Sequence, residues 1–396
     1  MDNLEKENLP EEEDVLEEEN TKKSRKWIIV LVVILLCFLI AIGGTVIWAV
    51  AYIKGIFKFN YNEITSDPVE LGYEEKKEDE IINIALFGLD TKNPNSFKGL
   101  SDSIMILSIN TDDNTVKLIS VMRDSFVPMT LYTGKVIHNK INSAYSTGGP
   151  EFAIKTLNTI FDLDISEYAT VNFYGMADII ETLGGIDVTL TEDEIYFING
   201  GIREQCSYLG IDPEPLYIES SGQLHLNGIQ AVAYSRIRYA ANSEGTANDY
   251  GRTDRQRYVL QQLFNKAAGM GYKELIELAK TLAPFCETSL THSEIISIAA
   301  DVLLEKPTFS ETRVPDQKYL MRAPATDAGS IVYYDLEFAA KLIHAYIYKD
   351  VVFEDYIAVN GIQQNDWYSA GFVAPEIDDE TLMPSVEDEV SQETTE

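Results

Sequence analysis

Apolar runs alternate with amphipathic stretches along most of the chain, and this pattern predicts strands that alternate with helices. Short apolar runs typical of buried strands occupy residues 81–87, 103–109 and 116–122. The turn-rich sequence TDDNT joins the last two runs and predicts a hairpin. Residues 168–173 and 186–190 are expected to form two further strands.

Helical periodicity lies between those runs. Residues 151–161 are amphipathic and follow Pro150, a residue that suits the first position of a helix. Residues 176–183 are expected to form a helix that ends at a pair of glycines. Residues 256–268 place their apolar side chains on one helical face, so they predict a third helix.

Two remaining segments complete the expected fold. Residues 191–222 show no regular period and are expected to be irregular, as the longest insertion, whereas residues 231–240 are expected to form a strand. Strands that alternate with helices indicate an α/β fold with a mixed central β-sheet and helices on its faces. We expect this domain to span residues 80–357.

One segment is too apolar for the surface of such a domain. Residues 27–53 carry no charge and are long enough to cross the ~30 Å hydrocarbon layer of a bilayer as one N-terminal transmembrane helix. Most flanking basic residues precede it, so the positive-inside rule predicts a cytoplasmic segment, residues 1–26, and an exterior location for residues 54–396. A cleaved signal peptide is the alternative, but the run is too long and no clear small-x-small site ends it. A polar stalk is expected at residues 54–79.

Negative charge is concentrated at both ends of the chain, whose 396 residues carry a formal charge of −33. Residues 1–20 hold ten acids and one lysine, and residues 376–396 hold nine acids and no base. Such segments repel themselves and bury nothing, so residues 358–396 are expected to form a disordered tail. The body between them is also acidic, which excludes the broad basic footprint of a non-specific nucleic-acid-binding protein.

Cysteine and histidine form no recognisable catalytic or metal-binding motif. Cys37 lies in the apolar segment, which leaves Cys206 and Cys286 outside, where a disulfide between them is an open alternative. The four histidines are scattered, and the sequence contains neither a Gly-x-Ser-x-Gly elbow nor a P-loop. A histidine-based triad is therefore not expected, and any proton transfer would fall to a carboxylate.

Charged residues stand at the ends of three predicted strands. Asp90 follows the first strand, Asp102 precedes the second, and Arg123 and Asp124 follow the third. Ligands of α/β proteins collect at strand ends and in the adjoining loops. Asp90 and Asp102 would share one loop, where two carboxylates could hold Mg²⁺ and leave positions for water and phosphate oxygens. The alternative is two ordinary aspartates that cap turns.

Arginine is concentrated in one window: five of the ten arginines lie between residues 236 and 257. Arg236 and Arg238 would point the same way on a strand, and Arg252 and Gln256 would share a face of the next helix. Asp249 is placed to cap that helix or to orient an arginine. Bidentate guanidinium groups near a helix N-terminus suit phosphate, but a salt-bridge network among the protein's own acids is an equally open interpretation.

The order of these motifs resembles that of the LytR-CpsA-Psr family of Gram-positive cell-envelope proteins. The resemblance covers about residues 80–268, after a single N-terminal anchor. The stretches that carry it are FGLD (87–90), SDSIMILS (101–108), SVMRDS (120–125), KINSAY (140–145), LGGIDV (183–188), LNGIQAVAYSRIRY (226–239) and DYGRTDRQR (249–257). Each motif is weak alone, whereas the whole series in one order is specific.

The resemblance implies a magnesium-dependent phosphotransferase outside the membrane. Such proteins move a glycopolymer, wall teichoic acid or a capsule-type polysaccharide, from an undecaprenyl-pyrophosphate carrier to a peptidoglycan sugar hydroxyl and form a phosphodiester. The resemblance assigns Mg²⁺ to Asp90 and Asp102, and support of the arginines to Asp249. The positions that match the pyrophosphate grip are Arg123, Arg236, Arg238, Arg252 and Gln256, with Lys140 and Arg255 as further substrate-binding candidates.

Other details of the resemblance leave alternatives. Asp102 is the first hypothesis for the general base and Asp124 the second. Residues 152–161 and 176–183 are candidates for the apolar helices that enclose the polyprenyl chain in the family, although core packing explains them equally well. The chain departs from the family at Met122, where proline is usual, and at Lys92, where arginine is usual; the second change replaces a bidentate phosphate contact by a point charge.

Three other functions compete with transfer. A pyrophosphatase would share the site and use water as the acceptor, and a non-catalytic envelope protein would use the arginines to hold a lipid-linked anion without a metal. The family's naming as transcription attenuators suggests a regulator. The predicted exterior topology and the missing basic DNA-reading element argue against direct DNA binding.

Overall fold

The computed structural model describes residues 60–360 except for the gaps at 92, 94–95, 271–273, 275–279, 282, 296, 299–307, 317–324 and 327–328. The predicted membrane anchor and most of the predicted acidic tail lie outside this part of the chain. Within the described residues, no helix combines the length and apolar character needed to span a membrane. The chain divides into two units, Met1–Phe57 and Lys58–Glu396, and the second contains every element below.

The bounds of the elements are as follows. The strands are β1 (Asn60–Tyr61), β2 (Ile81–Asp90), β3 (Leu100–Asn110), β4 (Thr115–Val121), β5 (Phe126–Thr130), β6 (Val136–Lys140), β7 (Glu167–Asn172), β8 (Ile186–Leu190), β9 (Gly222–Leu226), β10 (Cys286–Thr288), β11 (Thr308–Val314), β12 (Ala325–Thr326) and β13 (Gly329–Ser330). The helices are α2 (Ser143–Phe161), α3 (Phe173–Thr182), α4 (Glu192–Leu209), α5 (Gly228–Ser235), α6 (Asn248–Ala268), α9 (Leu336–Lys349) and α10 (Phe353–Asn360), with short 3₁₀ turns η1 (Glu214–Leu216) and η2 (Ala283–Phe285).

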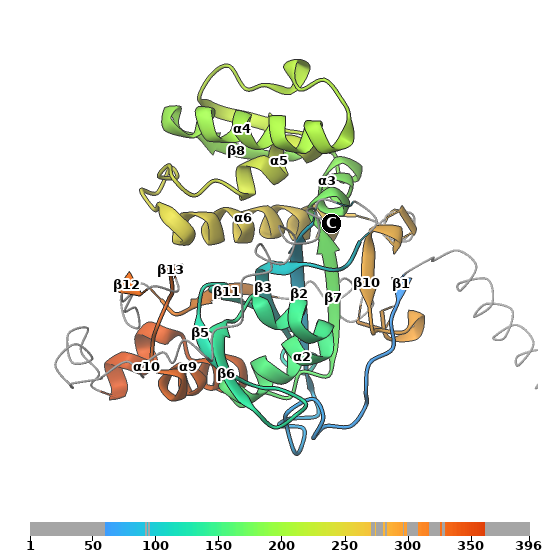
Figure 1. The fold of residues 1–396 in the computed structure, drawn as a ribbon, viewed down its shortest axis with the longest axis vertical. Coiled ribbons are helices and arrows are strands. Elements are labelled where there is room, and N and C mark those ends of the chain that lie inside the picture. The colour runs from blue at the N-terminus through green and yellow to red at the C-terminus, as the bar shows by residue number, and fades with distance from the viewer. Residues whose placement is uncertain are drawn as a thin grey trace, which may run out of the picture. The chain divides into compact units, whose positions relative to one another are not determined.

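The main sheet has seven strands in the order β1-β10-β7-β2-β3-β4-β11. β2, β3 and β4 form an antiparallel meander, whereas β7 runs parallel to β2 and β11 runs parallel to β4. The central strands and the helices beside them are seen in Figure 1. The expected α/β fold with a mixed central sheet and helices on its faces is confirmed.

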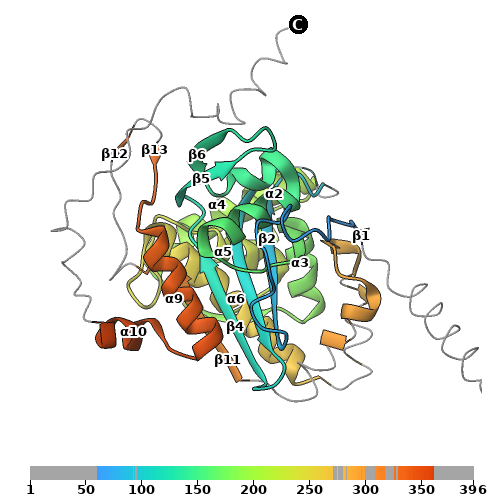
Figure 2. The same cartoon turned by 90° about the horizontal axis from the view of Figure 1, so that it is seen from below.

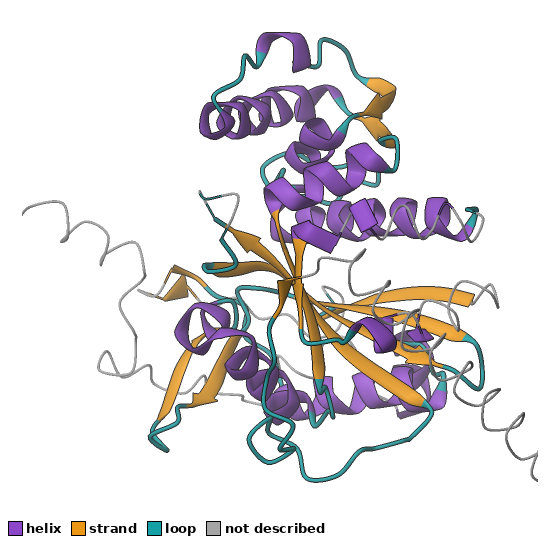
Figure 3. Cartoon of the chain, turned by 90° about the vertical axis from the view of Figure 1, so that its right-hand side faces the viewer, coloured by secondary structure: helices purple, strands orange, loops and turns teal. Residues whose placement is uncertain are grey.

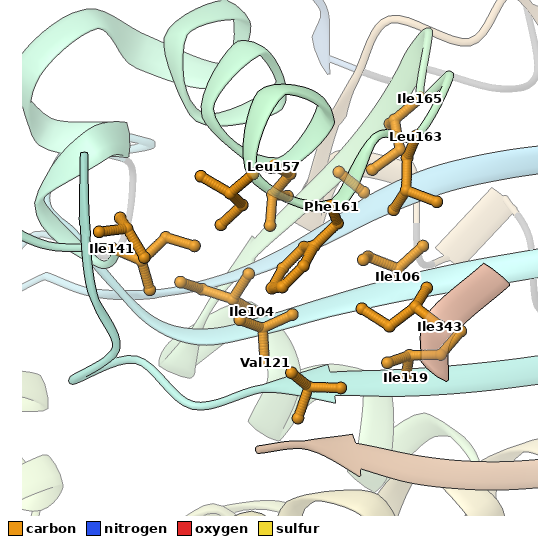
Figure 4. Packing of buried hydrophobic residues seen from close by; sticks show 14 of the residues in the cluster. Ile104, Ile106, Ile119, Val121, Ile141, Leu157, Phe161, Leu163, Ile165 and Ile343 are labelled. Atoms are coloured by element: carbon orange, nitrogen blue, oxygen red, sulfur yellow. The ribbon is translucent and has the colours of Figure 1, made fainter. Parts of the chain in front are cut away.

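Helices α2 and α9 cover one face of this sheet, as Figure 2 shows. Alternate residues of β2 point to that face and are buried, among them Phe87 and Leu89. In Figure 4, Phe161 of α2 lies among Ile104 and Ile106 of β3. Ile84 and Ile109 are buried on the other face, so both faces of these strands are covered and their sequences are almost continuously apolar.

Helix α6 lies against the opposite face, where Phe264 stacks on Phe309 of β11 with ring centroids 5.0 Å apart. Helices α3, α4 and α5 and the antiparallel pair of β8 and β9 build a second layer on α6, the helix-rich upper part of Figure 3. Their apolar side chains form a second core, which includes Ile202 of α4 and Val259 of α6. The ends of β2 and β3 lie beneath this helical layer, between the two cores.

Several local predictions are confirmed. The predicted hairpin is β3–β4, and α2 has non-helical angles at Gly148 and Gly149, so its regular part starts at Pro150. The predicted helix at residues 176–183 is part of α3, after which Gly185 has φ +73°. A Cβ at Gly185 would approach the carbonyl oxygen of Leu226 to 2.4 Å, so a side chain here would push the end of β9 away.

Two segment predictions are wrong. Residues 228–235 form helix α5 rather than the predicted strand. Helix α5 is covered by α3, α4 and α6, and an apolar run that is buried on all sides shows no helical period, so its sequence pattern did not indicate a helix. Residues 192–209, expected to be irregular, form helix α4, which starts with a capping box between Thr191 and Glu194. The T-x-x-E spacing was the missed signal.

The predicted stalk also requires correction, because residues 60–79 belong to the folded unit. β1 pairs with β10 at the edge of the main sheet. Leu71 is 1% exposed, and its carbonyl oxygen accepts a hydrogen bond from Asn158 of α2 at 2.8 Å. These contacts come from residues far along the chain, so the local composition of the segment did not reveal them.

Candidate functional site

Asp90 and Asp102 face the arginines from two paired strands. The sequence prediction that they share one loop is therefore wrong. Asp90 ends β2, and Asp102 lies inside β3. The register shifts there: Gly88 pairs with Ser103 and Leu89 pairs with Ser101, so Asp102 is the extra residue of a β-bulge. Bulges redirect a side chain out of the regular alternation. This one presents the Asp102 carboxylate to the layer that contains the arginines.

Three guanidinium groups surround the Asp102 carboxylate. Arg123 Nη1 donates a hydrogen bond to Oδ1 at 2.6 Å, while Arg238 Nη2 and Arg252 Nη1 lie 3.5 and 3.6 Å from Oδ2. Burial by itself raises the pKa of Asp102, but the charges of Arg123 and Arg252 outweigh it and lower the pKa below its usual value. Asp102 is therefore ionised at neutral pH and engaged on both oxygens.

Asp249 holds the same arginines from the start of α6. Its Oδ1 lies 2.8 Å from Arg252 Nη2, 3.6 Å from Arg123 Nε and 3.9 Å from Arg238 Nε. The N-cap of α6 is Ala247 and makes no side-chain capping bond. Of the two roles proposed for Asp249, the structure shows the orientation of arginines.

Arg236 stands somewhat apart from the other arginines. Its guanidinium lies 4.6 Å from the ring centroid of Phe173, 3.3 Å from Glu204 and 3.9 Å from Asp90. It follows α5 directly as the helix C-cap, so the α5 helix and not a strand aims it. Phe173 and Glu204 were missed by sequence reasoning because each belongs to a different helix.

Asp124 and Lys140 border this cluster. Lys140 Nζ lies 3.3 Å from Asp124 Oδ1, and Arg123 Nε lies 3.7 Å from Asp124 Oδ2. Lys140 ends β6, so the β5–β6 hairpin delivers it to the cluster. Its contact in the structure is with Asp124.

Arg255 does not reach the site surface, so its assignment as a substrate-binding residue is corrected. Its side chain is 0% exposed and lies 2.6 Å from Glu194. Its other nitrogens donate to the carbonyl oxygens of Ile237 and Ala240 at 3.0 and 2.9 Å. Arg255 thus holds the segment that carries Arg238. Arg257, from the same window, pairs with Asp254 and Glu311, away from the arginine cluster.

A polar cavity of about 320 Å³ opens beside the arginines. It is lined by Asp102, Phe197, Gly201, Glu204, Ala233, Arg236, Ile237, Arg238, Tyr239, Arg252 and Gln256. Arg252 and Gln256 line it together, as their spacing on one helical face predicted. Among the described residues, the buried Nε atoms of Arg123 and Arg252 lack a hydrogen-bond acceptor, and the carboxylate oxygens of Asp249 lack a donor, so hydrogen bonding within the cluster is incomplete.

The electrostatics favour an added anion, although the arginines already pair with the protein's acids. Burial lowers the pKa of Arg252 to about 10, and the charges of Arg123 and Arg238 contribute in the same direction. The charges of Asp249 and Asp102 oppose this shift by favouring the charged form of Arg252, and an anion that enters the cavity would favour it further. The two interpretations of the arginine window therefore coexist: it is a salt-bridge network with room for an anionic ligand.

A second cavity, of about 160 Å³, is almost entirely apolar and shares Gln256 with the polar cavity. It lies between the sheet and helices α3 and α6 and is lined by Leu86, Phe87, Gly88, Ser103, Met105, Ala169, Thr170, Val171, Asn172, Phe173, Met176, Ile179, Ser235, Gln256, Val259, Leu260 and Cys286. Of the two candidate lipid-enclosing segments, residues 176–183 contribute to this cavity. Residues 152–161 pack in the first core.

Asp90 and Asp102 have the ligand chemistry for a magnesium ion that a bound substrate would also hold. Asp90 and Asp102 interact electrostatically: burial raises the pKa of Asp90, Arg236 lowers it, and the charge of Asp102 raises it further. Carboxylate oxygens are the hard ligands that Mg²⁺ prefers, and it commonly takes only one or two of them together with phosphate and water. Within the described part of the chain, no three metal-ligating side chains form a cluster of their own. Phosphate oxygens would have to complete such a site.

Cys206 and Cys286 are both free thiols in the structure. The disulfide that the sequence left open is not formed. Cys206 is buried in the second core, and Cys286 lines the apolar cavity.

Two transferases of Bacillus species are similar to this chain in sequence. The chain is 25% identical over 313 residues to the polyisoprenyl-teichoic acid--peptidoglycan teichoic acid transferase TagU of Bacillus subtilis (strain 168), which covers 77% of this chain and 91% of that protein. It is 30% identical over 228 residues to the TagU of Bacillus cereus (strain AH820), which covers 57% of this chain and 66% of that protein.

Solved structures share the fold. A structure of TagT bound to LI-WTA has a TM-score of 0.53 and 18% identity, over 72% of this chain and 99% of that chain. The protein gbs0355 from Streptococcus agalactiae has a TM-score of 0.55 and 24% identity, over 72% of this chain and 98% of that chain. The profile of the LytR_cpsA_psr family matches residues 50–338, well over half of the sequence. This protein is therefore a member of the LytR_cpsA_psr family.

Proposed function

We propose that this protein transfers a glycopolymer, such as wall teichoic acid or a capsule-type polysaccharide, from an undecaprenyl-pyrophosphate carrier to a sugar hydroxyl of peptidoglycan. One observation carries the proposal: a cavity lined by arginines and an apolar cavity share Gln256 in their linings. A lipid pyrophosphate has the same two parts, a polyanion joined to a hydrocarbon chain. The TagU relatives, named as transferases of polyisoprenyl-linked teichoic acid to peptidoglycan, support the same substrate class.

The donor would bind through both cavities. Arg236, Arg238 and Arg252 line the polar cavity and would contact the pyrophosphate through charge-assisted hydrogen bonds. Arg123 would support them from below, since it already holds Asp102 and Asp249 in place. The first part of the polyprenyl chain would occupy the apolar cavity, where Met176 and Ile179 provide a surface without competing polar groups.

Transfer needs stabilisation of the charge on the phosphorus and removal of the proton of the attacking hydroxyl. The arginines are fixed by Asp102 and Asp249 before substrate arrives, so little reorganisation is needed to stabilise the developing charge. Asp90 and Asp102 would hold magnesium, which supplies further neutralisation of the phosphate oxygens. Asp102 and Asp124 are the two candidates to accept the hydroxyl proton, and the three guanidinium groups around Asp102 lower its pKa and so weaken it as a base. The bond to the undecaprenyl phosphate then breaks, and a glycan–phosphate–sugar diester remains.

The proposed location follows from the predicted anchor. Residues 27–53 would hold the protein in the cell membrane with the catalytic unit outside, where lipid-linked donor and peptidoglycan are both accessible.

The decisive test uses the purified full-length protein with a defined undecaprenyl-pyrophosphate glycan and peptidoglycan oligomers. The expected result is a phosphodiester-linked conjugate, identified by mass spectrometry, that requires magnesium and accompanies release of undecaprenyl phosphate. Free glycan phosphate formed equally with and without peptidoglycan would instead identify a pyrophosphatase. Donor binding without any product would identify a non-catalytic binding protein.

A further inference from the structure

Three aromatic side chains, two of them exposed and one partly buried, form a contiguous group at the edge of the polar cavity. Tyr196 and Tyr239 are 78% and 76% exposed. The ring of Phe197 lies between them, with centroids 5.2 Å from Tyr196 and 6.1 Å from Tyr239. Phe197 and Tyr239 also line the cavity itself. Single exposed aromatic residues are ordinary, whereas a cluster built from two distant segments at a cavity entrance indicates a binding surface.

We call Tyr196, Phe197 and Tyr239 the aromatic platform. It lies at one end of the group of arginines that line the polar cavity. Phe197, Gly201 and Glu204 line the cavity from one face of α4. Glu204 pairs with Arg236, which stacks on Phe173 at the border of the apolar cavity. The rise of a helix places Phe197 about 10 Å from Glu204 along α4. The platform and the apolar cavity therefore lie toward opposite ends of the polar cavity.

This arrangement matches the geometry of an in-line displacement. In phosphoryl transfer, the attacking and leaving oxygens lie on opposite sides of the phosphorus. The leaving group here is the lipid phosphate, whose chain occupies the apolar cavity under the proposed function. The attacking hydroxyl must then arrive from the opposite end, where the platform stands. The glycan stays attached to the phosphorus and extends to the side of the line that joins the attacking and leaving oxygens.

We infer that Tyr196, Phe197 and Tyr239 bind the acceptor, by stacking on the pyranose ring of the peptidoglycan sugar whose hydroxyl attacks. One face of a pyranose ring carries C–H groups, whose positive hydrogens suit the negative face of an aromatic ring. A tyrosine also offers its hydroxyl to the sugar's own hydroxyls. Tyr239 directly follows Arg238, so the same backbone segment would position the acceptor relative to the phosphate grip. The inference rests on the proposed function.

Steady-state kinetics of the full-length protein test this role with donor and acceptor varied separately. Tyr239→Ala is expected to raise the KM for peptidoglycan oligomers about tenfold and to leave the KM for the lipid-linked donor within about twofold. Tyr239→Trp keeps a stacking surface and is expected to retain the wild-type KM. Tyr132→Ala is the matched control, because Tyr132 is 65% exposed and lies on another part of the fold. An unchanged acceptor KM, or a rise in the donor KM alone, would overturn the inference.

A binding measurement separates failure of this inference from failure of the proposed function. Saturation-transfer NMR with peptidoglycan oligomers is expected to show contact between protein aromatic protons and sugar C–H protons, lost in Phe197→Ala and Tyr239→Ala. If oligomer binding depends on Tyr239 but the protein has no transferase activity, the proposed function would be overturned and the platform retained. If the protein is an active transferase and neither substitution changes its oligomer binding, the platform alone would be overturned.

Discussion

Arg255 and Glu194 form a completely buried ion pair that joins helix α6 to the first turn of helix α4. The Nε of Arg255 donates to Glu194 Oε1 at 2.7 Å, while Glu194 Oε2 accepts the capping bond from the backbone N–H of Thr191. Arg255 also holds the carbonyl oxygens of Ile237 and Ala240. One arginine thus fixes the segment that carries Arg238 of the proposed phosphate site and Tyr239 of the aromatic platform.

Arg255→Lys tests this support. A lysine ammonium cannot serve Glu194 and two carbonyl oxygens in the fork geometry of a guanidinium. We expect the free energy of unfolding to fall by about 3 kcal/mol, as for a broken buried ion pair, and transfer to fall more than about tenfold. Denaturant titration and the transferase assay measure the two effects. Arg203→Lys, at an exposed position of α4, is the control and is expected to change neither. A stable, fully active Arg255→Lys protein would remove the supporting role.

Asp102→Asn and Arg123→Ala test the centre of the site. Each removes the shortest ion pair of the cluster, 2.6 Å between Arg123 Nη1 and Asp102 Oδ1. We expect each variant to fold and to lose at least about 100-fold in magnesium-dependent transfer, because the remaining arginines lose their fixed arrangement. The conjugate is quantified by mass spectrometry, with Arg203→Ala as the control. Transfer at the wild-type rate in either variant would show that the site has been assigned wrongly.

Met176→Trp tests the apolar cavity as the lipid site. Met176 lines that cavity from α3, and the larger indole would occupy part of its volume of about 160 Å³. We expect about tenfold weaker binding of the undecaprenyl donor and little change for a donor with a short prenyl chain. Competition binding with the two donors measures the difference. Equal weakening of both would place the lipid chain elsewhere.

Cys286 provides a chemical probe of the same cavity. Burial raises the pKa of its thiol to about 11, so at pH 8 only about one molecule in a thousand carries the reactive thiolate. We expect slow alkylation of the folded protein, a rate that rises with pH up to about 11, and further protection by the undecaprenyl donor. Mass spectrometry of the alkylated peptide follows the reaction, and denatured protein gives the unprotected rate. Rapid alkylation at pH 8, or a rate that the donor does not change, would contradict the proposed location.

Local sequence patterns were sufficient for the central strands and for most of the site's membership. The short apolar runs at residues 81–87 and 103–109 indicate strands buried in a sheet, and that signal is contained within each run. Arg252 and Gln256 were expected on one face because helical spacing is a local property, and the structure places both at the polar cavity. The family resemblance named the remaining site residues in advance of any geometry.

Tertiary structure decided what depends on contacts between distant segments. The bulge that aims Asp102 exists only because β3 pairs with β2 in a shifted register, and Glu204 meets Arg236 only because α4 packs on α5. Burial on all sides removed the helical period from residues 228–235, so the strand predicted there was wrong. Arg255 could not be separated by sequence from the arginines that line the polar cavity, because all of them are arginines of the same window. Its inward direction is set by Glu194, whose position depends on the packing of α4 against the rest of the helical layer.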